Sequence, residues 1–106
     1  MLKKNQRLSR TEFTHYFKIG TRINSEYLTI VRAKATTFKA AVVVGKKVYK
    51  AAVDRNRLKR QVYSKIRELN PNSTGIYLVL VKPPLAKLTA AKRKQALTTE
   101  LGAVIN

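Results

Sequence analysis

Three runs of apolar and β-branched residues along this chain predict β-strands. The first covers residues 27–32 and the second covers residues 39–44, and the short polar link at 34–37 predicts that these two strands pair as a hairpin. The third run, residues 76–81, follows a turn-rich segment at 70–75 and stops before Pro83. Because its apolar character is unbroken, we expect a central strand that is buried on both faces.

Two helical patterns flank these strands. Ser9-Arg10-Thr11-Glu12 fits a capping box, so a helix is expected to begin there and to end near Gly20. A last helix is expected from about Thr89, with its apolar residues four and three positions apart. The first helix has three aromatic residues on one face, which can either fill the core or line a groove where bases stack: Phe13, Tyr16 and Phe17.

The longest helical pattern, from about residue 51 to residue 69, has two contrasting faces. One face is an apolar stripe that should pack on the sheet: Leu58, Val62, Ile66 and Leu69. Arg55 falls near the apolar side, where it can either contact a ligand or cap a neighbouring carbonyl. The opposite face is a polar stripe flanked by two further cations, and it comprises Asn56, Arg60, Tyr63 and Arg67 with Arg57 and Lys59 beside them.

The net charge of the chain indicates what kind of molecule it binds. Its 106 residues contain 23 Lys plus Arg and 5 Asp plus Glu, which gives a net charge of +18. Such self-repulsion destabilises a compact state unless a polyanion neutralises it, so nucleic acid is the expected partner and affinity should fall steeply with salt. Because 44% of the residues are hydrophobic, we still expect a folded core, as a single nucleic-acid-binding domain over residues 1–106.

The composition also limits the chemistry. There is no cysteine and only one histidine, so neither a disulfide framework nor a multi-histidine metal site is expected. No apolar run reaches the length of a membrane span, so we expect a soluble, cytoplasmic protein with no membrane partner. The five acids form no pattern typical of a metal-binding carboxylate set, so the protein is expected to bind without catalysing: Glu12, Glu26, Asp54, Glu68 and Glu100.

A longer motif resembles the signature of a known protein family. Lys46-Lys47, followed by Lys50-Ala51-Ala52-Val53-Asp54-Arg55-Asn56-Arg57-Leu58-Lys59-Arg60, resembles the signature of the bacterial ribonuclease P protein subunit. The opening of the chain, Arg7-Leu8, Phe13, Phe17 and Gly20, resembles the first helix of that family. The resemblance implies an α+β fold, a two-layer α/β sandwich of order αβββαβα like the second domain of ribosomal protein S5, with a left-handed βαβ crossover and an extra short strand at residues 22–24.

The resemblance also implies that the protein and a catalytic RNA subunit have separate roles in removing the 5′ leader of precursor tRNA. The catalytic RNA subunit would hold the Mg²⁺ ions and cut, and one protein per RNA subunit would assist without catalytic residues of its own. The residues expected to bind RNA are Lys46, Lys47, Lys50, Arg55, Asn56, Arg57, Lys59, Arg60, Tyr63 and Arg67. Those expected to border the leader groove are Phe13, Phe17, Tyr27, Thr29 and Val31.

Two positions depart from the family pattern, and the charge is also compatible with two other classes of protein. Tyr63 stands where the family usually has arginine, and Val31 stands where many members have an aromatic residue. A structural protein that binds ribosomal RNA would share the small size and the charge. A DNA-binding module of the helix-turn-helix type requires two consecutive helices joined by a tight turn. The hairpin expected before Arg55 argues against that class.

Overall fold

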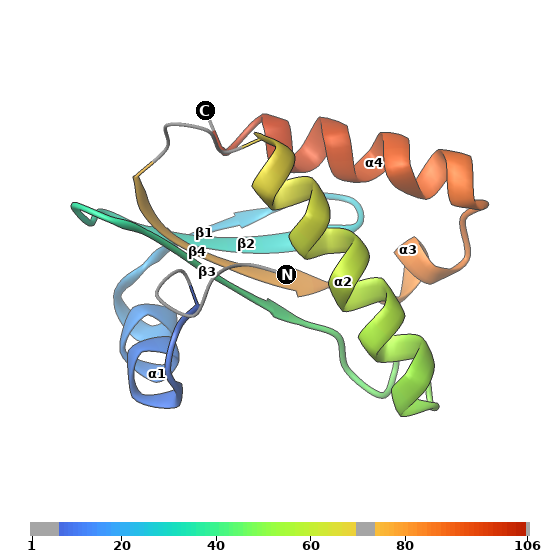
Figure 1. The fold of residues 1–106 in the computed structure, drawn as a ribbon, viewed down its shortest axis with the longest axis horizontal. Coiled ribbons are helices and arrows are strands. Elements are labelled where there is room, and N and C mark those ends of the chain that lie inside the picture. Colours follow the sequence, from blue (N-terminus) through green and yellow to red (C-terminus); the bar gives the residue numbers. More distant parts are fainter. Residues whose placement is uncertain (1–6, 70–73, 106) are drawn as a thin grey trace.

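The order of helices and strands follows the sequence pattern closely. The computed structural model describes residues 7–69 and 74–105, so residues 70–73 of the predicted turn lie outside the described part. The predicted order αβββαβα is confirmed, with one short additional helix, α3, before the last. The elements are α1 (Arg10–Ile19), β1 (Thr21–Asn24), β2 (Leu28–Ala33), β3 (Phe38–Val43), α2 (Ala52–Leu69), β4 (Gly75–Val81), α3 (Pro83–Ala86) and α4 (Ala90–Gly102) (Figure 1).

The strands form one mixed sheet in the order β1-β2-β4-β3. The prediction that the strands at 27–32 and 39–44 form a hairpin is wrong, because β4 lies between them. It pairs antiparallel with β2 and parallel with β3. A strand that is apolar on both faces is most stable at the centre of a sheet, and α2 provides the long crossover that the parallel pair requires. The hairpin that does form joins β1 to β2.

Alternating side chains on the sheet contribute to two separate cores. On one face, Leu28, Ile30 and Val79 lie in a main cluster that α2 and α4 cover. On the other face, Val31, Ile76 and Leu78 pack against α1 (Figure 1). The central strand β4 is therefore buried on both faces, as predicted.

The N-terminal end of helix α1 is fixed by specific contacts. Ser9 Oγ accepts a hydrogen bond from the Glu12 amide at 3.2 Å, and Glu12 Oε1 accepts one from the Ser9 amide at 3.0 Å, which confirms the predicted capping box. The other carboxylate oxygen of Glu12 accepts from Lys39 Nζ on β3 at 2.8 Å. One carboxylate thus caps the helix and ties it to the sheet.

Gly20 ends α1, as predicted, and its lack of a side chain also affects how closely α1 packs on the sheet. Its φ of −71° is open to any residue, so conformational freedom is not what this position requires. A Cβ atom added there would lie 2.5 Å from Val31 Cγ1 and 2.8 Å from the Tyr16 carbonyl oxygen. Glycine therefore lets α1 approach β2 closely.

Replacing Gly20 should test this close approach. We expect Gly20→Ala to lower the free energy of unfolding by about 1–3 kcal/mol, because the added methyl group overpacks the contact with Val31. Gly102→Ala is the matched control, since a Cβ there meets nothing within 4 Å. Urea unfolding followed by circular dichroism measures both, and equal stability of the two variants would contradict the steric explanation.

Acid titration should reveal the contribution of Glu12. Hydrogen bonds from Lys39 and from the Ser9 amide lower the pKa of Glu12 from its ordinary 4.5 to about 2. Because the pKa in the folded state is the lower one, the ionised carboxylate stabilises the fold above pH 4.5, and that contribution is lost as the pH falls from about 4.5 to about 2. We expect Glu12→Gln to be less stable than the unmodified protein at pH 7 and equally stable near pH 2, as measured by urea unfolding across this range.

A second substitution separates the two causes of the shift. With Lys39→Met, the cap remains but the cation is gone, so the pKa of Glu12 should rise towards its ordinary value. The effect of Glu12→Gln should then disappear at a higher pH than in the unmodified background. A stability difference that stays constant from pH 7 to pH 2 would rule out this role for the carboxylate.

Candidate nucleic-acid interface

The segment between β3 and α2 presents cations on a loop with apolar anchors. Val48 and Tyr49 are half-buried and pack against the main cluster. The amides of both residues donate to the Gly45 carbonyl, at 3.1 and 3.4 Å, which closes a turn. The side chains of Lys46, Lys47 and Lys50 are exposed. This pattern holds three of the predicted RNA-binding residues at the surface beside the start of α2.

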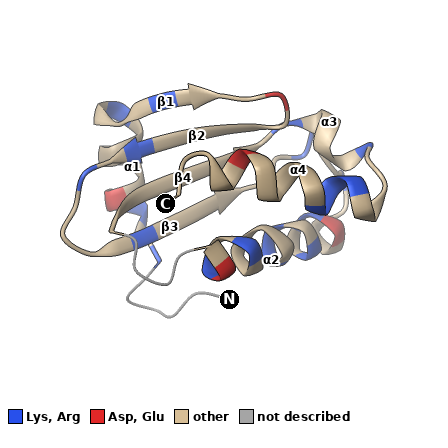
Figure 2. Ribbon diagram, turned by 90° about the horizontal axis from the view of Figure 1, so that it is seen from above, with Lys and Arg blue, Asp and Glu red and all other residues tan. Residues whose placement is uncertain are grey.

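Helix α2 continues this positive surface. Asn56, Arg57, Arg60 and Arg67 are exposed and Lys59 is half-buried, so these predicted residues lie towards the outside of the helix. Figure 2 shows how positions of Lys and Arg recur along α2. In the described part of the chain, none of these cations forms an ion pair with a carboxylate; the ion pairs found there are Lys39–Glu12 and Lys65–Glu68. We call the following set the basic surface: Lys46, Lys47, Lys50, Asn56, Arg57, Lys59, Arg60 and Arg67.

The prediction that Tyr63 belongs to the polar stripe is wrong. Its side chain is only 7% exposed, and its hydroxyl oxygen accepts a hydrogen bond from the Val42 amide at 3.1 Å. Strand β3 lies at the edge of the sheet, so this amide has no partner strand, and the tyrosine hydroxyl satisfies it. Because α2 packs against both α4 and β3, its buried arc is wider than a stripe centred on Leu58. Tyr63, at about 140° from Leu58, falls inside that arc.

The buried arc of α2 also contains a cation. Lys65 is 7% exposed, and its Nζ lies 3.3 Å from Glu68 Oε2. The long aliphatic stem fills the helix-packing surface while the ammonium group reaches an exposed carboxylate. Glu68 is exposed. The predicted apolar residues of α2 pack in or against the main cluster: Leu58, Val62, Ile66 and Leu69.

Arg55 caps carbonyl groups, which was one of its two predicted alternatives. Its Nη1 atom donates to the carbonyl oxygens of Tyr49 at 3.1 Å and of Lys50 at 2.6 Å. Both hydrogens of that nitrogen are thereby engaged within the protein. The guanidinium group folds back onto the loop that precedes α2 and does not project along the outer face of the helix.

The opposite face of the sheet brings together a second group of predicted residues. Phe13 and Phe17 of α1 stack with their ring centroids 5.9 Å apart, and both are half-buried against the second core. Thr29 points to the same face of β2, and its hydroxyl donates to Asn24 Oδ1 at 2.9 Å. Val31 lies beneath α1 and is only 1% exposed, so it supports this face but offers no surface for stacking.

Three residues of this face were missed by the sequence reasoning. The Arg22 guanidinium lies 4.4 Å from the centre of the Phe17 ring, a cation–π contact that adds positive charge at the aromatic surface. Val43 is 38% exposed and Leu80 is half-buried, and their positions pair across β3 and β4. Alternation along the strands could have placed them, had the pairing partner of β4 been known. We call this surface the open sheet face, comprising Phe13, Phe17, Arg22, Thr29, Val43 and Leu80.

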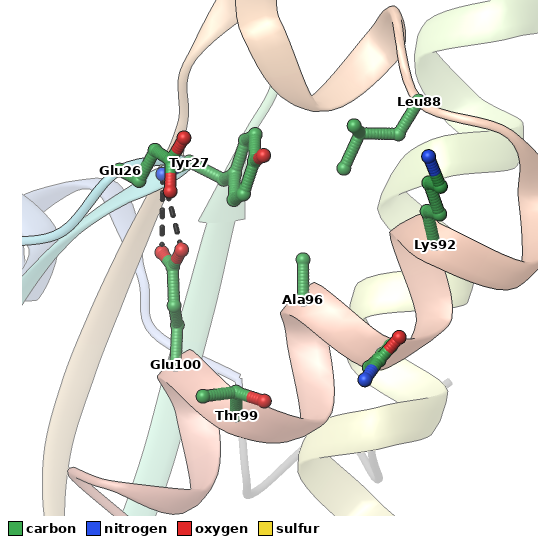
Figure 3. Close-up of a pocket in the computed structure, with 8 residues that line it drawn as sticks. Glu26, Tyr27, Leu88, Lys92, Ala96, Thr99 and Glu100 are labelled. Atoms are coloured by element: carbon green, nitrogen blue, oxygen red, sulfur yellow. Dashed lines mark hydrogen bonds between the residues drawn. The ribbon is translucent and has the colours of Figure 1, made fainter.

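Tyr27 does not belong to the open sheet face, and its assignment to the leader groove is corrected here. It packs with the main cluster on the other side of the sheet, and it lines a pocket of about 350 Å³ against α4 (Figure 3). Its amide donates to both carboxylate oxygens of Glu100 at 3.2 Å. Tyr27 precedes β2, where the backbone has left the regular alternation, so counting along the strand assigns it to the wrong face. Burial raises the pKa of Glu100, against the opposing effect of the amide hydrogen bonds.

The acids of the described residues form no metal-binding cluster, although Glu26 and Glu100 line the same pocket. Within residues 7–69 and 74–105, no three His, Asp or Glu side chains form a group that could hold a metal ion. Glu12 holds α1, Glu68 pairs with Lys65, and Glu100 binds the Tyr27 amide. None of the helices in the described part has the length and apolar character needed to cross a bilayer.

Comparison with known proteins places the chain in a family. The ribonuclease P family model matches residues 2–104. The ribonuclease P protein component of Exiguobacterium sp. is 31% identical over 100 residues, covering 91% of this chain and 87% of that protein. The corresponding protein of Lactobacillus gasseri is 33% identical over 88 residues, covering 77% of this chain and 72% of that protein.

Solved structures share the fold. The Staphylococcus aureus RNase P protein superposes with a TM-score of 0.84 at 19% identity, covering 95% of this chain and 98% of that chain. The RNase P protein from Thermotoga maritima superposes with a TM-score of 0.77 at 24% identity, covering 94% and 98%. Since the family model spans almost the entire sequence and relatives above 30% identity align over most of their length, the chain belongs to the ribonuclease P protein family.

Proposed function

We propose that this protein binds the RNA subunit of ribonuclease P through the basic surface and the 5′ leader of precursor tRNA through the open sheet face. Its family makes it the protein component of a ribonucleoprotein that processes tRNA, with the RNA subunit as its partner. In this proposal one protein joins one RNA subunit, and the RNA performs the cleavage.

The basic surface supports the first part of the proposal and is the observation that carries it. Its cations are exposed, except for the half-buried Lys59, and no carboxylate of the described residues forms an ion pair with them. The cations of α2 are held on a helix whose other side is packed in the core, so they keep their spacing without a ligand. A rigid row of unpaired cations suits the phosphate backbone of a folded RNA.

The open sheet face suits a different form of RNA. Stacked phenylalanine rings beside an arginine offer a platform on which unpaired bases can stack, and such stacking is tolerant of sequence. The face lies across the sheet from the main cluster that carries α2. A single-stranded leader could therefore occupy it while the RNA subunit occupies the basic surface.

The placement of the acids supports an RNA-based reaction. Three of the five carboxylates are engaged in contacts that hold the fold, each on a different part of the chain. In this proposal the Mg²⁺ ions needed for phosphodiester hydrolysis are held mainly by the RNA subunit. The protein would contribute positive charge and a binding surface for the leader.

Processing of precursor tRNA tests the proposal directly. We expect a bacterial ribonuclease P RNA at low magnesium to release the 5′ leader faster with this protein than without it, and the protein alone to be inactive. Arg57→Ala with Arg60→Ala should weaken binding to the RNA by about tenfold or more, because two charge-assisted contacts are lost. The slope of log affinity against log salt should become shallower by about 1.5. Filter binding across a salt series measures both quantities.

Two controls accompany this double variant. Lys34→Ala with Lys94→Ala removes the same charge from exposed positions outside the basic surface and should leave the slope nearly unchanged. Both double variants should unfold cooperatively with stabilities within about 0.5 kcal/mol of the unmodified protein. Cleavage by the protein alone, or equal slopes for the two double variants, would contradict the proposal.

Substitution of Phe17 tests the leader-binding surface. Phe17→Leu keeps apolar bulk but removes ring stacking, so the preference for leader-bearing over leaderless tRNA should fall by about fivefold, within the range measured for base–aromatic stacking. Tyr27→Leu is the matched control, because Tyr27 lies on the other side of the sheet. Binding of both tRNA forms to the reconstituted holoenzyme measures the effect, and equal preference in the two variants would remove Phe17 from the leader surface.

A further inference from the structure

Two arginine side chains from different helices meet at Tyr49, which lies in the basic loop, residues 44–51 between β3 and α2. Arg55 of α2 donates to the Tyr49 carbonyl oxygen at 3.1 Å and to the next carbonyl, that of Lys50, at 2.6 Å. From the other side, Arg93 of α4 donates through Nη2 to the Tyr49 hydroxyl oxygen at 3.3 Å. Backbone and side chain of one tyrosine are thus held by separate cations.

Arg93 also binds the segment that connects α3 to α4. Its Nη2 atom lies 3.3 Å from the Ala86 carbonyl oxygen and 3.2 Å from that of Leu88, and its Nε lies 3.4 Å from that of Leu85. The guanidinium group is half-buried, and Leu85 is fully buried in the main cluster. Arg93 therefore connects Tyr49 to a part of the protein that the core holds rigid. The starts of α2 and α4 lie at the same end of the molecule in both views (Figures 1 and 2).

The residues that flank Tyr49 are the exposed lysines of the basic surface. Lys46 and Lys47 precede it and Lys50 follows it, and none of them has an ion-pair partner within the described residues that would fix its position. Their placement follows from the loop backbone, and the loop is anchored where Tyr49 is held. A binding loop that is ordered before it meets its ligand loses less conformational entropy on binding.

We propose that Arg55 and Arg93 are positioning residues that hold Tyr49 and so pre-organise Lys46, Lys47 and Lys50 for contact with RNA phosphates. The inference rests on the proposed function. In it, Arg55 acts on the RNA through the loop, since both hydrogens of its Nη1 are already donated to carbonyl oxygens. Arg93, which lies outside the Arg-Asn-Arg motif, becomes part of the RNA-binding apparatus without belonging to the basic surface.

The substitution Tyr49→Phe tests this with no change of charge. It removes only the hydroxyl group that accepts from Arg93 and keeps the ring that packs against the main cluster. We expect affinity for the ribonuclease P RNA to fall by about two- to tenfold, the range of one net hydrogen bond. The slope of log affinity against log salt should also become shallower by about 0.7 to 0.9, because a displaced loop loses a phosphate contact. An altered slope in a variant of unchanged charge must come from contacts that other residues make.

Arg93→Gln and Lys94→Gln form the matched pair for the second arginine. Both remove one positive charge from neighbouring positions of α4, but only Arg93 contacts Tyr49. Arg93→Gln should reproduce the change of slope seen with Tyr49→Phe, and the double variant should add little to either, whereas Lys94→Gln should resemble the unmodified protein. A role in stability alone would lower the unfolding midpoint of Tyr49→Phe and leave its salt slope unchanged.

The outcomes separate this inference from the proposed function. If the unmodified protein fails to bind the ribonuclease P RNA, the proposed function itself is wrong. If it binds with a steep salt dependence and Tyr49→Phe binds with the same affinity and slope, only the positioning role is overturned. Equal effects of Arg93→Gln and Lys94→Gln would overturn it as well, because they would reduce Arg93 to a general contribution of charge.

Discussion

Strand β4 has apolar side chains on both faces, so it is stable only where both faces and both edges are covered. Strands β2 and β3 cover its edges, and the helices cover its faces: α2 and α4 on one side and α1 on the other. Since β3 runs parallel to β4, the chain between them must travel back across the sheet, and α2 makes that crossing. The basic loop and the outer face of α2 are placed by this requirement.

The same strand separates the two candidate surfaces. Side chains alternate across the sheet, so neighbouring residues of β2 serve different cores: Ile30 supports the side of α2, and Val31 supports the side of α1. The open sheet face and the basic surface are consequently built on opposite sides of one rigid layer. Their geometry relative to each other does not depend on a hinge or a linker, which suits the proposed binding of two RNA segments at once.

Much of this arrangement could be predicted from the sequence. The predictions that were wrong share one cause. The capping box at Ser9, the apolar stripe from Leu58 and the central strand at 76–81 depend on residues close together in the chain, and all three were correct. The hairpin, the exposure of Tyr63 and the face of Tyr27 depend on which element lies next to which. Local periodicity carries no information on that point: Tyr63 is buried because β3 happens to lie beside it.

Arg55 shows the same limit at the level of a motif. Within Arg-Asn-Arg, the two arginines are chemically identical, yet Arg57 is exposed on the outer face while Arg55 is half-buried with one nitrogen bound to two carbonyl oxygens. Two helical positions separate them by about 160° around the axis, which turns one towards solvent and the other towards the preceding loop. In the proposed function the two arginines have different roles: the guanidinium of Arg57 meets phosphate, and that of Arg55 holds the loop that carries the remaining cations. The spacing of the motif then reflects the geometry of the helix start as much as that of the RNA.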